Sequence, residues 1–279
     1  MTATSATASL PTELERVIFE LAAHADPKTI PTLLRVAQRV RIWLEPLLYR
    51  VLIFENETRL KVLEVIKVKP ALFLASTVRH VHFVQGITVG TTESILEACP
   101  GIVNLSLDWR IKVPNLLPLL GNMHLQRLAA DLGKLFGDDN AVDLEHPLFP
   151  SVTHLDLLGG IDTENEVWMK CLSTLPALTH LALTAPNEDD LPLMRDILGA
   201  SPRMQILLAV FDDSSACTAT SFAAGIHFVH ARLVVGLDDG ADWERDARGG
   251  EGMWNRAEEF VTRKRRGEIK DDCYFMDED

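Results

Sequence analysis

The sequence has few cysteines, few aromatic residues and no long hydrophobic run. Its four cysteines show no Cys-x-x-Cys spacing, so neither a disulfide framework nor a zinc-finger site is predicted. No apolar run approaches the length of about 18 residues that a transmembrane helix requires. The opening residues MTATSATASL carry no basic residue and no apolar stretch, so they do not predict a secretory signal. We therefore expect a cytoplasmic or nuclear protein.

The chain also lacks an excess of positive charge. Its 279 residues include 27 Lys and Arg against 40 Asp and Glu, which gives a net charge of −13. Nucleic acid and membrane surfaces are therefore not expected partners. The motifs of serine hydrolases, zinc proteases, phosphate-binding loops and dinucleotide-binding turns are absent as well. The sequence predicts no cofactor, no metal ligands and no enzymatic activity.

One phrase recurs along the chain. FPSVTHLDLLGG at 149–160 and LPALTHLALTAP at 175–186 share the pattern Pro, x, aliphatic, x, x, Leu, x, Leu. Six such phrases follow one another at steps of 23 to 27 residues, with these middle residues: Val81, Leu105, Leu128, Leu155, Leu181 and Leu207. A repeat of about 20–29 residues centred on Leu-x-x-Leu-x-Leu is typical of leucine-rich repeats, which bury their apolar edges by stacking. The predicted fold class is α/β, a leucine-rich-repeat solenoid of about six irregular repeats.

Residues 10–54 have a different periodicity. Leu14, Ile18 and Leu21 follow one another at helical spacing and predict an amphipathic helix. A second apolar face runs from Leu33 to Leu44, beyond the helix-breaking segment ADPKTIP. Such a helical hairpin is too small to bury a large core, so part of its apolar surface must contact either the rest of the chain or a partner.

The segments LPTELERVIFELA and LLRVAQRVRIWLEPLLYR resemble the F-box of fungal F-box and leucine-rich-repeat proteins, in particular the basidiomycete type. The resemblance implies that residues 10–54 dock on a Skp-type adaptor of a cullin-RING ubiquitin ligase. The adaptor-binding residues that it implies are Leu10, Pro11, Leu14, Ile18, Leu21, Leu33, Leu34, Val36 and Trp43. Departures such as Ala37 and Gln38 after Val36 leave a second hypothesis open, in which the module is only a cap on the first repeat.

The predicted domains are then an F-box-like helical module at 10–54, a repeat solenoid at 55–237, and a C-terminal capping helix with an acidic tail at 238–279. Residues on either side of each middle residue should line the concave face of the solenoid. The polar residues among them are predicted to bind the target protein: His80, His82, Asn104, Arg127, His154, Asp156 and His180. His154 and His180 should be direct neighbours on adjacent strands, with Asp156 beside them.

We therefore expect a protein–protein interaction module, the substrate-receptor subunit of a ubiquitin ligase, which acts as a monomer within a larger complex. Two alternatives remain open at this point. One is a repeat scaffold without a ligase. The other is an enzyme that uses His154, Asp156 and His180 for acid–base or metal chemistry, although the sequence identifies no further ligand.

Overall fold

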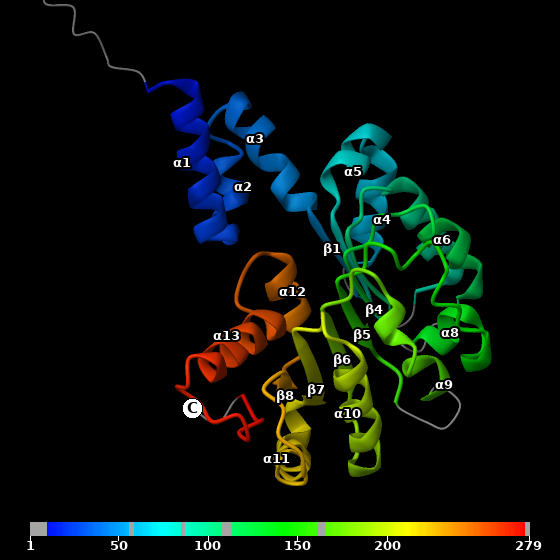
Figure 1. Ribbon diagram of the computed structural model, residues 1–279. Coiled ribbons are helices and arrows are strands. Elements are labelled where there is room, and N and C mark those ends of the chain that lie inside the picture. The colour runs from blue at the N-terminus through cyan, green and yellow to red at the C-terminus, as the bar shows by residue number, and fades with distance from the viewer. Residues whose placement is uncertain (1–9, 56–58, 85–86, 108–112, 161–165, 277–279) are drawn as a thin grey trace, which may run out of the picture. The chain divides into compact units, whose positions relative to one another are not determined.

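The structure is a computed structural model that describes residues 10–55, 59–84, 87–107, 113–160 and 166–276. The chain forms two compact units, residues 1–50 and residues 51–279 (Figure 1). Within the described ranges, no helix is both long enough and apolar enough to cross a lipid bilayer. Residues 51–54, which the sequence prediction assigned to the N-terminal module, form the first strand of the second unit.

The N-terminal unit contains helices α1 (Thr12–Ala25), α2 (Ile30–Leu33) and α3 (Gln38–Tyr49), with a short 3-10 turn at Pro27–Thr29. The side chain of Asp26 accepts a hydrogen bond from the Lys28 amide and caps this turn. A small apolar core joins the helices, and its fully buried members are Ala23, Ile30, Val40 and Leu44.

The second unit is built on one sheet of eight parallel strands in sequential order. The strands are β1 (Val51–Phe54), β2 (His80–Phe83), β3 (Asn104–Leu107), β4 (Arg127–Ala130), β5 (His154–Leu157), β6 (His180–Thr184), β7 (Ile206–Asp212) and β8 (Leu233–Asp238). The middle residues of the six phrases pair across the sheet in one continuous row, from Val81 to Leu207. Side chains alternate between the two faces of the sheet, so both faces require cover.

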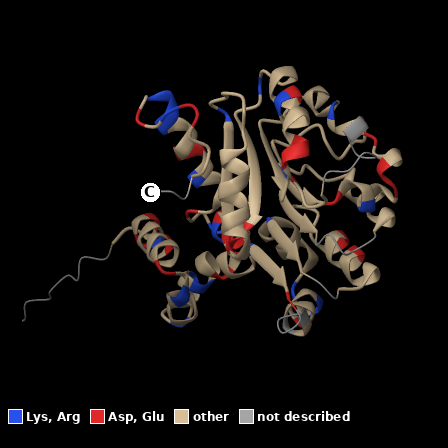
Figure 2. Cartoon of the chain, turned by 90° about the horizontal axis from the view of Figure 1, so that it is seen from below, with Lys and Arg blue, Asp and Glu red and all other residues tan. Residues whose placement is uncertain are grey.

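One face of the sheet packs against the helices that connect the strands. These helices are α4 (Arg59–Val68), α5 (Ala71–Thr77), α6 (Val89–Ala98), α7 (Leu117–Leu120), α8 (Leu132–Phe136), α9 (Glu166–Met169), α10 (Leu191–Ala200) and α11 (Ala216–Ala224), with 3-10 turns at Pro114–Leu116, Asp139–Ala141, Leu172–Thr174, Glu188–Asp190 and Asp213–Ser215. Leucines of the strands and apolar residues of the helices form the main core. Charged side chains gather on the helices and loops, whereas the strands are largely uncharged (Figure 2).

The opposite face is covered by the C-terminal helices α12 (Asp242–Ala247) and α13 (Met253–Arg265). Trp254, Ala257, Phe260 and Val261 of α13 form a second apolar cluster with Ala182, Ile206, Leu208, Val210 and Val234 of the strands. The segment after α13 also packs, because Tyr274 donates a hydrogen bond to the Phe228 carbonyl and Phe275 bridges to Val235. This segment was expected to be an acidic tail, yet Tyr274, Phe275 and Met276 are buried in the core of the unit.

The expected fold class, a leucine-rich-repeat solenoid of about six repeats with an F-box-like module and a C-terminal cap, is wrong. The chain does have an α/β fold, but its described residues form one eight-stranded, all-parallel sheet rather than a solenoid. The phrase Leu-x-x-Leu-x-Leu specifies a short strand with one buried edge, and any strand-and-crossover unit of similar length satisfies it. β1 and β8 lie outside the six phrases, and the C-terminal helices cover a face of the sheet rather than its end.

Candidate functional site

An apolar stripe follows the outer surface of α1 in the N-terminal unit. It consists of Leu14, Val17, Ile18 and Leu21, which we call the α1 stripe, and their exposed fractions lie between 48% and 63%. Their spacing of i, i+3, i+4 and i+7 places them on one side of the helix. The other side of α1 packs inward through Phe19 and Ala23. The helix is therefore apolar on two sides, and only one of them is used by the core of the unit.

The residues implied to bind an adaptor divide into two groups. Leu10, Pro11, Leu14, Ile18, Leu21 and Val36 are exposed. Leu33, Leu34 and Trp43 are half-buried and pack against the small core. Two exposed apolar residues, Val17 and Ile42, were missed by the sequence prediction. The helical spacing from Leu14 was the signal that could have found Val17.

An ion pair fixes the orientation of α1 against α3. Arg39 donates hydrogen bonds from Nε and Nη2 to the two carboxylate oxygens of Glu15, at 2.8 and 2.7 Å. These hydrogen bonds lower the pKa of Glu15 and raise that of Arg39. The pair links α1 to α3 at the surface of the unit, in addition to the packing of Phe19 and Ala23 in the core.

The seven predicted target-binding residues lie on one face of the sheet in the second unit. Five of them form a direct ladder across β2 to β6: His80, Asn104, Arg127, His154 and His180. The prediction that His154 and His180 are neighbours is confirmed, since the two residues are paired in register. None of the seven side chains is exposed, because this is the face that α12 and α13 cover. The face that was predicted to bind a target protein is therefore covered by helices of the same unit.

Aromatic contacts account for much of this cover. Trp243 of α12 stacks on His82, with ring centroids 5.1 Å apart. Trp254 of α13 meets His154 and His180 edge-on, at 5.2 and 5.6 Å. Tryptophan supplies a large apolar surface to the imidazole rings, so polar side chains of the sheet become the floor of a buried interface.

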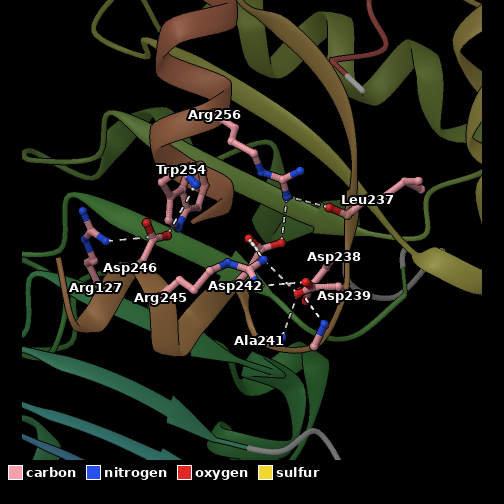
Figure 3. A network of polar contacts seen from close by, with 11 residues as sticks. Arg127, Leu237, Asp238, Asp239, Ala241, Asp242, Arg245, Asp246, Trp254 and Arg256 are labelled. Atoms are coloured by element: carbon pink, nitrogen blue, oxygen red, sulfur yellow. Dashed lines mark hydrogen bonds and ion pairs between the residues drawn. The ribbon is translucent and has the colours of Figure 1, made fainter. Parts of the chain in front are cut away.

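Ion pairs join the covering helices to the sheet and to each other (Figure 3). Asp242 accepts hydrogen bonds from Arg245 at 2.7 Å and from Arg256 at 2.8 Å. Arg256 also donates to the Leu237 carbonyl at the end of β8. Arg127 of β4 lies 4.0 Å from the carboxylate of Asp246. Asp242 is buried, so its two arginines are needed to offset the cost of removing its charge from water.

A cavity of about 40 Å³ remains between the sheet and these helices. Its lining includes Arg127, His154, Asp156, Asp238 and Trp254. Burial and the nearby carboxylate of Asp238 raise the pKa of Asp156 to about 7, and its Oδ1 atom has no hydrogen-bond partner. Such a group can exchange a proton near neutrality. However, the cavity has room for only a few water molecules, far less than a substrate pocket requires.

Burial also changes the two histidines beside this cavity. Burial and then the positive charge of Arg127 lower the pKa of His180 to about 4. Burial, His180 and Arg127 lower the pKa of His154 further. Both histidines are therefore neutral at pH 7, with lone pairs available as acceptors or ligands.

The sequence was compared with models of known protein families and with curated proteins. Neither comparison finds a match. The resemblance to F-box proteins therefore depends on the N-terminal residues alone, and function has to be argued from the surface and the buried groups described above.

Proposed function

We propose that the protein is a protein–protein interaction module whose α1 stripe docks on a Skp-type adaptor, making the chain a substrate receptor of a cullin-RING ubiquitin ligase. The observation that carries the proposal is the row of four large apolar side chains left open to solvent on α1. Leu10 and Val36 are exposed apolar residues of the same unit. Exposed apolar surface of this kind is uncommon in a soluble protein unless a partner covers it.

The pattern of the stripe fits a helical recognition surface. Anchors at i, i+3, i+4 and i+7 are the arrangement by which an amphipathic helix enters an apolar groove. The ion pair between Arg39 and Glu15 holds the helix before the partner arrives, which reduces the entropy lost on binding.

The charges on α1 favour a protein partner over a lipid surface. Helices that bind membranes carry lysine and arginine on the polar face, since the phospholipid surface is anionic. α1 carries three glutamates, Glu13, Glu15 and Glu20, against one arginine, Arg16. An anionic membrane would therefore repel this helix.

The proposal assigns a site for the adaptor but not for the target protein. A target protein could reach the seven predicted residues on the sheet only if α12 and α13 left that face, because the helices cover it. A site for the target is therefore not assigned to the sheet.

The test is a binding measurement between the full chain and a purified Skp-type adaptor. We expect the wild type to bind and the double variant Leu14→Asp, Ile18→Asp to lose binding, because two charges would replace anchors of the stripe. A matched control is Leu60→Asp, Leu72→Asp, which changes two leucines of α4 and α5 that are more exposed than the stripe residues and should bind like the wild type. Circular dichroism checks that all three proteins are folded.

Two results would contradict the proposal. One is a folded wild type that does not bind the adaptor. The other is a stripe variant that binds as tightly as the control variant. Either result would favour the alternative in which the helical unit does not serve a ligase.

A further inference from the structure

Three ligand-type side chains meet where α13 crosses β5 and β6. His154, His180 and Glu258 each present one potential ligand atom, and these atoms lie within 4.8 Å of one another. Nε2 of His180 is 3.4 Å from Oε1 of Glu258. The two imidazole rings are stacked, with centroids 4.1 Å apart and planes almost parallel. The parallel register of β5 and β6 produces this stack, because it places the two histidines directly opposite each other.

Two threonines assign the protons of the rings. The hydroxyl of Thr153 donates to the Gln126 carbonyl at 3.0 Å and lies 2.9 Å from Nδ1 of His154. Thr179 repeats the arrangement, with its hydroxyl 3.2 Å from the Thr153 carbonyl and 2.8 Å from Nδ1 of His180. A hydroxyl has one proton, so a threonine that donates to a carbonyl must accept from Nδ1–H. This network favours the Nδ1–H tautomer for both rings, which leaves a lone pair on each Nε2.

No hydrogen-bond donor of the described residues faces the lone pair of either Nε2 atom. Nε2 of His154 and Nε2 of His180 are both buried without a hydrogen-bond partner, and His180 is only 4% exposed. The carboxylate of Glu258 faces the same space and is also an acceptor. Three acceptors that converge without a donor repel one another and lose their interactions with water.

We propose that His154, His180 and Glu258 bind one divalent transition-metal ion of the zinc class. Zinc is bound by neutral imidazole and by carboxylate oxygen, and two histidines with one glutamate are a set that leaves a fourth position for water. The Nδ1–H tautomer is the one required for ligation through Nε2, and the threonines supply the second shell that orients the rings. The side chain of Glu258 is half-exposed, which gives the ion a path from solvent.

Binding changes the stack of the two rings. The lone pair of each Nε2 lies in the plane of its ring, so a shared ion requires the parallel rings to tilt towards each other. Trp254 contacts the edges of both rings, so its environment should change with them. Arg127 is the nearest opposing charge, and the carboxylate of Asp246 at 4.0 Å offsets part of it.

The site differs from the other carboxylate cluster near α12. Asp238, Asp239 and Asp242 also bring oxygens within 4.8 Å of one another. However, Arg245 binds both Asp239 and Asp242, and Arg256 binds Asp242. The charges of Asp239 and Asp242 are therefore already compensated by arginines, whereas no donor in the described ranges is paired with Nε2 of His154 or Nε2 of His180.

The test is a zinc titration of the full chain after removal of bound metal with a chelator. Cys171 and Cys217 are exposed and would also bind zinc, so they are first blocked by alkylation of the folded protein. We expect one zinc ion per chain in the wild type. Glu258→Gln should weaken binding by at least about tenfold, the lower limit for losing a partner of a metal site. Glu259→Gln makes the same change at the next, equally exposed position and should bind like the wild type.

A second measurement identifies the ligands. Cobalt(II) bound in place of zinc should give visible absorption of a nitrogen-ligated, low-coordinate ion, and this should be lost in His154→Asn. Folding of each variant is verified by circular dichroism. A wild type that binds no zinc, or equal affinities of Glu258→Gln and Glu259→Gln, would overturn the proposal. Failure of adaptor binding would have no bearing on it, because the adaptor site lies in the other unit.

Discussion

The two units of the protein differ in which side chains of their amphipathic elements are exposed to solvent and which are covered. The N-terminal unit has a small core and leaves Leu14, Val17, Ile18 and Leu21 exposed. The sheet unit encloses polar groups, and the most buried of these are Thr92, Asn104, Ser106, His180, Asp242 and Lys264. A row of apolar side chains on one helix is therefore exposed in the first unit, while a row of polar side chains on the sheet is covered in the second.

This difference shows what can be inferred from each kind of surface. An open apolar face costs free energy in water, so it indicates a partner that is not in the chain. A closed polar face costs free energy unless its groups are paired, so it draws attention to the pairs and to the groups left without one. Two of the unpaired groups in the sheet unit, Nε2 of His154 and Nε2 of His180, are used in the metal proposal.

The largest expected effect is in the core of the sheet. Leu155→Ala removes a fully buried side chain and should lower the free energy of unfolding by about 2–5 kcal/mol. Leu21→Ala on the α1 stripe removes the same atoms from an exposed position, so it should change stability by no more than about 0.5 kcal/mol. Urea unfolding curves compare the two. Equal losses would mean that the stripe is buried in solution.

A buried lysine should make the free energy of unfolding of the sheet unit depend on pH in the alkaline range. Nζ of Lys264 donates to the Leu233 carbonyl, and burial lowers its pKa to about 8 from 10.5. The unfolded chain holds this proton more tightly, so stability should rise as the pH increases from about 8 towards 10.5. The gain should be about 1–3 kcal/mol.

The control for this prediction is a pair of methionine variants. Lys264→Met should lose the rise in stability because the titrating group is absent. Lys67→Met, at an exposed position of α4, should keep it. A rise that persists in Lys264→Met would assign the effect to another group.

The ion pairs of α12 should contribute a similar or smaller amount. Asp242→Asn removes the charge that binds Arg245 and Arg256 and should cost about 1–3 kcal/mol, because its partners lose charged hydrogen bonds at a buried site. Asp196→Asn breaks an ion pair in which both side chains are mostly exposed, so it should change stability very little. Thermal unfolding of both variants measures the difference. Equal effects would show that the cover over the sheet does not depend on this network.

The smallest expected effect on stability is that of substitutions in the α1 stripe. Leu14→Asp and Ile18→Asp should each change the free energy of unfolding by about 0.5 kcal/mol or less, since both side chains are more than half exposed. Chemical denaturation measures this in the same samples that are used for adaptor binding. A large loss would mean that the residues serve the fold, and the comparison between the two units would then fail.

Several features could be predicted from the sequence. The repeated phrases mark the six strands that contain Val81, Leu105, Leu128, Leu155, Leu181 and Leu207. Their alternation and spacing also predict that His154 and His180 are neighbours. These are local properties, because successive side chains on a strand point to opposite faces of the sheet.

The same sequence pattern could not distinguish a leucine-rich-repeat solenoid from another parallel sheet, and the predicted solenoid is wrong. Strand length, alternation and a return segment are shared by leucine-rich repeats and by other parallel sheets. The strands at 51–54 and 233–238 complete a sheet of eight. Which of these folds forms depends on how the connecting helices and the C-terminal segment pack, and the phrase does not encode that.

The sequence by itself determined which residues share a face: the α1 stripe, the leucines of the core and the polar row of the sheet. Only the tertiary structure decided which faces are covered. Trp243 reaches His82, and Glu258 reaches His180, across long stretches of chain. Such contacts depend on the packing of α12 and α13 against the whole sheet, so no local pattern contains them. Periodicity orients side chains relative to their own strand or helix, whereas burial depends on which other element comes to lie on top.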